Sequence, residues 1–115
     1  MPQKEKPISA KKESEQHKIP NPISLGLSFI LGNPVNYTYL FIGKTLLEAS
    51  PDGSSTLSKT KLVGQTVVVT GIVHRSKGLK IYVLRRSDNK DFYHGLPQIY
   101  ADVPSAIVAQ ELSLL

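Results

Sequence analysis

Runs of apolar, β-branched and aromatic residues, several alternating with polar positions, predict five β-strands along this chain. The first covers Leu25–Leu31 and the second Val35–Leu47. The third, from Gln65 to His74, is apolar on both faces, so it is expected at the centre of a sheet. The fourth covers Leu79–Arg86, and a fifth lies within Phe92–Ala101. This pattern favours an all-β domain.

Turn-forming residues separate these strands. Gly32-Asn33-Pro34 predicts a hairpin that pairs the first two strands, and residues 50–55 form a flexible loop. Ser76-Lys77-Gly78 and the segment 87–90 are tight turns. Gly71, inside the third strand, predicts a bulge or sharp bend of the kind that small barrels need.

The two ends of the chain differ from the middle. Asp102 or Val103 is expected near the N-cap of a helix that has Pro104 in its first turn and continues to Leu115. Residues 1–22 mix lysine, glutamate and proline, and they have too few apolar residues to bury, so they predict a disordered basic arm. The arm is either a plain tail or an auxiliary cationic contact. Residues 23–115 are then a single domain, a small five-stranded barrel with a short C-terminal helix.

Composition excludes several classes of protein. The chain has 115 residues, enough for one domain, and no cysteine. Disulfides, cysteine-ligated metals and thiol catalysis are therefore excluded, and the composition agrees with the reducing cytoplasm. The segment between Lys18 and Lys44 is uncharged, but Gly32-Asn33-Pro34-Val35-Asn36 interrupts it, so no membrane span is expected.

Positive charge is concentrated in one segment. The whole chain has 14 basic and 9 acidic residues and a formal charge of +5. The segment His74–Lys90 alone contains six cations and one acid, Asp88. Its cations are Arg75, Lys77, Lys80, Arg85, Arg86 and Lys90. A local basic patch of this kind favours a polyanionic partner.

Catalytic patterns are missing from the sequence. No histidine pair has the spacing of a metal site, and no glycine-rich phosphate loop precedes a helix. The acidic residues around the turns are typical of turn and cap positions. These are Asp88, Asp91 and Asp102. We therefore expect a protein that is not an enzyme, with no cofactor and no metal.

The main indication of a function is a set of basic residues interleaved with aromatic residues. Proteins that bind single-stranded nucleic acid combine cations that follow the phosphates with aromatic faces that stack on bases. On the fourth strand, Tyr82 lies between Lys80 and Arg86 on one face, so it could stack while its neighbours meet phosphates. The predicted contact residues are Arg75, Lys77, Lys80, Tyr82, Arg86 and Tyr93. Tyr37 or Tyr39 are weaker candidates, because both are also compatible with a barrel wall.

The stretch LVGQTVVVTGIVHR, followed by GLKIYVLRRSD, resembles the OB-fold anticodon-binding domain of class II aminoacyl-tRNA synthetases. The matching positions are Gly64, Gly71, Arg75, Tyr82 and Arg85. The resemblance implies an OB-like barrel in which Arg75 and Tyr82 face nucleic acid. The chain departs from the family at Ile72, where many members have tryptophan, and it ends at the helix that in the family precedes two further strands. In this interpretation the hairpin 24–47 replaces the missing strands.

Two functions follow as hypotheses. The first is non-catalytic binding of single-stranded DNA or RNA, or of structured RNA, by the basic, aromatic-bearing hairpin. The alternative is an OB-like protein–protein interaction subunit of a larger complex, which would dock through its apolar C-terminal helix and the run Ile23–Leu31. The fold alone does not decide between them.

Overall fold

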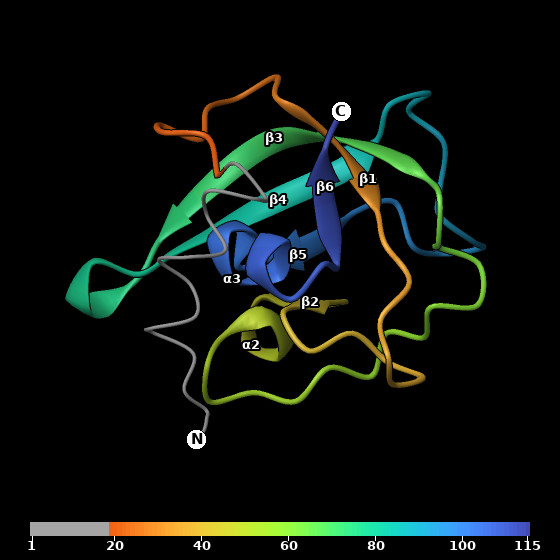
Figure 1. Cartoon of the computed structure of the whole chain (residues 1–115), viewed down its shortest axis with the longest axis horizontal. Helices are drawn as coiled ribbons and strands as arrows, with labels where there is room; N and C mark the ends of the chain where they lie inside the picture. The colour runs from red at the N-terminus through yellow and green to blue at the C-terminus, as the bar shows by residue number, and fades with distance from the viewer. Residues whose placement is uncertain (1–18) are drawn as a thin grey trace.

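A computed structural model describes residues 19–115, so most of the predicted N-terminal arm lies outside the described residues. These residues form one six-stranded antiparallel sheet, in the order β2-β5-β4-β3-β1-β6 (Figure 1). The elements are β1 (Ser28–Leu31), β2 (Ile42–Gly43), α2 (Leu46–Ala49), β3 (Thr66–His74), the 3-10 turn η1 (Ser76–Gly78), β4 (Lys80–Arg86), β5 (Ile99–Ala101), α3 (Val103–Val108) and β6 (Leu112–Leu114). The all-β class is confirmed.

The sheet curls around its core, and the short helices α2 and α3 lie within the curve (Figure 1). Alternate residues of the central strands point inward, among them Val67 and Val69 on β3 and Tyr82 and Leu84 on β4. They pack with Phe29 of β1 in one hydrophobic cluster. The structure has six strands rather than the predicted five, and its end strands, β2 and β6, are not paired with each other.

The centre of the sheet follows the sequence prediction. β3 and β4 pair over their whole length around η1, and β3 is a central strand, as expected. The register shifts between Val69, which pairs with Leu84, and Gly71, which pairs with Val83. This is the predicted bulge. A Cβ on Gly71 would lie 3.2 Å from a methyl group of Val83, so glycine permits the close approach of the two strands.

The predicted N-terminal hairpin is wrong. Both edges of β1 are occupied, by β3 on one side and by β6 on the other. Of the predicted strand Val35–Leu47, only Ile42 and Gly43 form a strand, and they pair with β5. Residues 35–41 cross to the other end of the sheet as a loop in which Val35 is fully exposed, and Leu46 and Leu47 begin α2. Because β3 and β6 already pair with both edges of β1, the high β propensity of these residues does not make them a strand.

The C-terminal helix is shorter than predicted. Asp102 is its N-cap and accepts hydrogen bonds from the backbone and the hydroxyl of Ser105, with Pro104 in the first turn, as expected. The helix ends at Val108, and Gln110 takes a left-handed backbone conformation (φ 63°). The following apolar residues form β6 instead, because this strand buries Leu112 against the core and completes the second edge of β1.

A buried carboxylate connects the two end strands. Glu111, which is 1% exposed, directly precedes β6. Its side chain accepts hydrogen bonds from the backbone N–H groups of Leu40 (2.7 Å) and Phe41 (2.9 Å), in the segment that leads into β2. Its backbone carbonyl accepts from Gly32 N–H at 2.8 Å. Burial, and then the charge of Glu111, raise the pKa of Tyr39, whose hydroxyl donates to the Gly32 carbonyl.

None of the helices formed by residues 19–115 combines the length and the apolar character needed to cross a bilayer.

Candidate functional site

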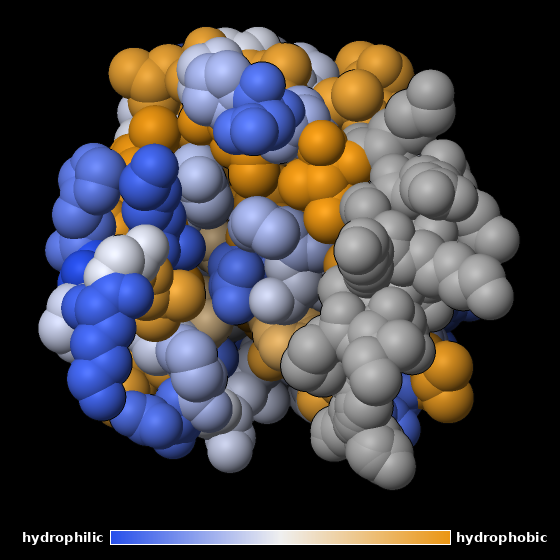
Figure 2. Space-filling view, turned by 60° about the vertical axis from the view of Figure 1, so that its left-hand side comes forward, coloured by the Kyte–Doolittle hydropathy of each residue, from blue (hydrophilic) through white to orange (hydrophobic). Residues whose placement is uncertain are grey.

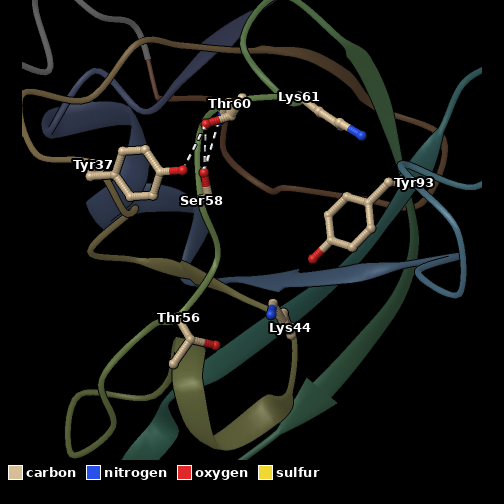
Figure 3. Close-up of a pocket in the computed structure, with 7 residues that line it drawn as sticks. All are labelled: Tyr37, Lys44, Thr56, Ser58, Thr60, Lys61 and Tyr93. Carbon is tan, nitrogen blue, oxygen red and sulfur yellow. Dashed lines mark hydrogen bonds between the residues drawn. The ribbon is translucent and has the colours of Figure 1, made fainter.

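A cleft of about 320 Å³ opens between three loops at the end of the sheet where β3 begins and β4 ends (Figure 3). Two tyrosines and two lysines converge on it, together with three hydroxyl side chains. The lining residues are Tyr37, Lys44, Thr56, Ser58, Thr60, Lys61 and Tyr93.

The first wall is built by a short antiparallel contact between two loops. Lys59 N–H donates to the Tyr37 carbonyl at 3.0 Å, and Tyr39 N–H donates to the Leu57 carbonyl at 3.2 Å. Tyr39 and Leu57 are both buried, so they anchor the two loops in the core. The alternation along the loop then turns Tyr37 outward, where its side chain is 66% exposed.

Hydroxyl groups orient the Tyr37 phenol. Ser58 Oγ accepts from Thr60 N–H (3.1 Å) and donates to Thr60 Oγ1 (2.9 Å), which in turn donates to the Tyr37 phenol oxygen at 3.1 Å (Figure 3). Hydrogen bonds with Ser58 and then Thr60 lower the pKa of Tyr37. Because the phenol oxygen accepts in this chain, its own proton is left to donate to a group in the cleft.

The floor of the cleft depends on Glu48 of α2. Its carboxylate accepts hydrogen bonds from Lys44 N–H (3.0 Å), from Thr56 N–H (3.0 Å) and from the Thr56 hydroxyl (2.8 Å). Thr45 caps the same helix by accepting from Glu48 N–H. One side chain therefore fixes the backbone at two lining positions that are far apart in the sequence.

Glu48 makes the stability of this floor depend on pH. Burial alone would raise the pKa of Glu48, but the hydrogen bonds from Thr56 and Lys44 outweigh it, and the pKa lies below its usual value of 4.5. A lowered pKa stabilises the folded state above pH 4.5, and this contribution is lost as the pH falls through the folded-state pKa. We expect the Tm of the native chain to fall more steeply between about pH 5 and pH 3 than that of Glu48→Gln. Equal slopes in thermal unfolding followed by circular dichroism would contradict this role.

The second wall is Tyr93, held by a loop that Arg86 organises. The guanidinium of Arg86 forms an ion pair with Asp88 (2.6 Å) and donates to the Asp91 carbonyl (3.1 Å). The hydrogen bond from Lys90 N–H, and then Arg86, hold the pKa of Asp88 below its usual value. The side chain of Phe92 next to Tyr93 is buried in the core. Arg86 is therefore occupied in supporting this loop.

The structure divides the predicted contact residues between two places. Tyr93 lines the cleft, and Arg86 supports it from behind. Arg75, Lys77 and Lys80 are exposed at the tip and base of the β3–β4 hairpin, at the opposite end of β4. Since β4 has seven residues, the two ends are about 20 Å apart.

One predicted role needs correction. Tyr82 is 5% exposed and belongs to the hydrophobic core, so its ring offers no open face on which a base could stack. The strand alternation does place Tyr82 between Lys80 and Arg86, but that face of β4 is the inner one, since it also contains Leu84. Tyr39 is also buried, because it anchors its own loop in the core, and the exposed tyrosine of that loop is Tyr37.

Sequence reasoning missed five of the seven lining residues; four lie on the loop between the second and third predicted strands, and Lys44 lies within the predicted strand Val35–Leu47. They are Lys44, Thr56, Ser58, Thr60 and Lys61. The dense run of hydroxyls and lysines over residues 54–61 was the available signal. Nothing in the sequence shows that this run faces Tyr93, because the two are brought together only by the pairing of β3 with β4.

Within residues 19–115, no group of three or more histidine, aspartate or glutamate side chains is arranged to hold a metal ion. No protein-family model, curated protein or solved structure matches the chain. The function is therefore inferred from the geometry of its own residues.

Proposed function

We propose that this protein binds single-stranded DNA or RNA without catalysis, and that the cleft between Tyr37 and Tyr93 is its principal contact. The observation that carries the proposal is the convergence of an exposed tyrosine, Tyr37, a half-buried tyrosine, Tyr93, and two lysines on one cleft. Unpaired bases present faces that stack on aromatic rings, and their phosphates require cations nearby.

The charges of the cleft suggest which of its two lysines contacts the phosphate. Lys44 lies close to Glu48, which offsets part of its charge. Within residues 19–115, Lys61 is in no ion pair, so it is the stronger phosphate contact. The Tyr37 phenol adds a neutral donor, held in place by Thr60. The volume of about 320 Å³ is at the lower end of the range for small-ligand sites and suits a single nucleotide unit.

We include an OB-like interpretation in the proposal. The two strands that carry the resemblance to anticodon-binding domains are β3 and β4, the longest and most central pair of the curled sheet. OB-fold barrels bind single strands through one sheet face and the loops beside it.

Fluorescence anisotropy with labelled single-stranded DNA, single-stranded RNA and duplex DNA tests the proposal. We expect tighter binding to single strands than to the duplex and a steep loss of affinity with salt. Tyr37→Ala with Tyr93→Ala should weaken single-strand binding at least tenfold, since each stacked base contributes about 1–3 kcal/mol. Lys44→Glu with Lys61→Glu should do the same and should reduce the salt slope by about 0.7 for each lost phosphate contact.

Lys90→Glu is the matched control, because Lys90 is exposed on a nearby turn but does not line the cleft. It should change the affinity less than threefold. Equal losses for Lys90→Glu and for the cleft lysines, or no single-strand binding at low salt, would overturn the proposal.

A protein partner is the second candidate function, now supported by a strand rather than by the predicted helix. β6 is an end strand of the sheet, and the residues Leu114 and Leu115 at its end are exposed. An exposed strand edge can accept a strand from another chain. Sedimentation that shows concentration-dependent association unaffected by oligonucleotides would favour this function.

A further inference from the structure

A second pocket lies at the other end of β4, at the base of the β3–β4 hairpin. We propose that it is an independent second site for an unpaired nucleotide of the same single strand. This inference rests on the proposed function and extends it, because it makes the protein a two-site binder.

The pocket also has a volume of about 320 Å³, and three separate parts of the chain form it. Residues 19–23 form one side, the first turn of α3 contributes Pro104, and β4 contributes Lys80 and Tyr82. Most of the lining is proline and isoleucine, which gives flat apolar surface against which a base can pack. Figure 2, which turns the hairpin side of the molecule forward, shows hydrophilic and hydrophobic residues side by side on this face.

Polar groups at this pocket match the edge of a base. Tyr82 is inaccessible to stacking but lines the pocket wall. Burial, and then the charge of Asp102, raise the pKa of its phenol, so the hydroxyl stays protonated at neutral pH. Asn21 offers both a donor and an acceptor at the rim. A base that packs against the apolar lining can thus also be held here by its edge.

One cation lines this pocket, and two more lie on the hairpin turn that follows β3. Lys80 lines it directly, and its cross-strand partner His74 precedes Arg75 in the chain. Arg75 and Lys77 are exposed on the turn of the hairpin. In the described part of the chain, none of these three cations is in an ion pair with a carboxylate. They are available to the phosphates on either side of an inserted base.

The separation of the two sites determines how strands of different length should bind. The second pocket lies at the Lys80 end of β4 and the cleft lies beyond its Arg86 end, so the length of this strand, about 20 Å, lies between them. A trinucleotide is too short to occupy both with a base at each, whereas a 20-mer can reach both. Linking two weak contacts through one strand raises the overall affinity by about 10²–10⁴ over either contact alone.

The first experiment maps binding of an unlabelled trinucleotide by amide chemical shifts in the ¹⁵N-labelled full chain. We expect two separate sets of shifted resonances, one around Tyr37, Lys61 and Tyr93 and one around Ile23, Lys80 and Tyr82. Lys44→Glu with Lys61→Glu should remove the first set only. Arg75→Glu with Lys80→Glu should remove the second set only.

The second experiment compares affinities for a 20-mer. The native chain should bind it at least a hundredfold more tightly than the trinucleotide, and either double charge reversal should remove most of this advantage. Asn21→Ala, which adds no charge, should weaken the second set of shifts and leave the first unchanged. Circular dichroism and thermal unfolding check that each variant folds.

The outcomes separate the two proposals. Shifts confined to the cleft, with no effect of Arg75→Glu and Lys80→Glu on the 20-mer, overturn the second site and leave the proposed function standing. Shifts confined to the hairpin pocket overturn the cleft as the principal contact and, with it, the two-site inference. An absence of shifts at both places overturns both.

Discussion

Replacing Glu111 by alanine is expected to lower the free energy of unfolding by about 3 kcal/mol or more. The substitution removes the buried carboxylate that accepts from two backbone N–H groups, those of Leu40 and Phe41. Each buried donor left without a partner costs about 1–3 kcal/mol. A domain of this size has a total stability of about 5–15 kcal/mol, so the loss should be plain in urea unfolding followed by circular dichroism.

The matched variant is Glu111→Gln, which keeps one side-chain acceptor oxygen and nearly the same volume. It should lose clearly less stability than Glu111→Ala. A loss below about 1 kcal/mol for Glu111→Ala would show that water or a rearranged loop replaces the carboxylate at little cost.

Phe29→Ala is expected to have the other large effect, a loss of about 3–5 kcal/mol. Phe29 is fully buried on β1, between Val67 of β3 and Leu114 of β6. Truncation removes apolar contacts and leaves a cavity, because the strands on both sides prevent the site from collapsing. The same urea titration measures it, and the unfolding midpoint should shift with little change in slope.

Two control variants test whether the loss of stability comes from the core contact of Phe29. Phe29→Leu keeps most of the volume and should cost less than about 1.5 kcal/mol. Ile30→Ala, one position along the same strand, changes a half-buried side chain on the opposite face and should cost less than Phe29→Ala. If all three variants lose similar stability, β1 does not depend on this core contact.

Local pattern was sufficient for the centre of the fold. The correct predictions all lie in one hairpin, whose two strands are adjacent in the sequence. They are the strand from Gln65 to His74, the turn at Ser76-Lys77-Gly78 and the bulge at Gly71. Alternation and turn chemistry determine such a hairpin directly.

The hydrophobic pattern did not predict the pairing of strands that are far apart in the sequence. The sequence predicts that Leu25–Leu31 pairs with the next apolar run, but β1 pairs instead with residues beyond position 110. The run Leu112–Leu115 continues the apolar side of the predicted helix, and only the free edge of β1 makes a strand there more favourable. Choice between partners depends on the whole sheet and not on propensity.

The candidate site was predictable only in its chemistry. Lysine and tyrosine were expected at the surface, and the structure does bring tyrosine and lysine together. The residues differ because both faces of β4 contain apolar side chains, so the sequence does not show that Tyr82 points inward. Loops supply most of the cleft, and the pairing of β3 with β4 brings them to Tyr93.

The place of β1 in the sheet has a consequence for how the chain folds. The β3–β4 hairpin closes between near neighbours, whereas β1 must meet Leu112–Leu114 from the far end of the described chain. Closing so long a loop carries a large entropy cost before any contact compensates for it. We therefore expect a polarised transition state, with φ-values near 1 around the hairpin and near 0 in β1 and β6. Destabilising substitutions at Phe29 should then speed unfolding and leave the refolding rate almost unchanged.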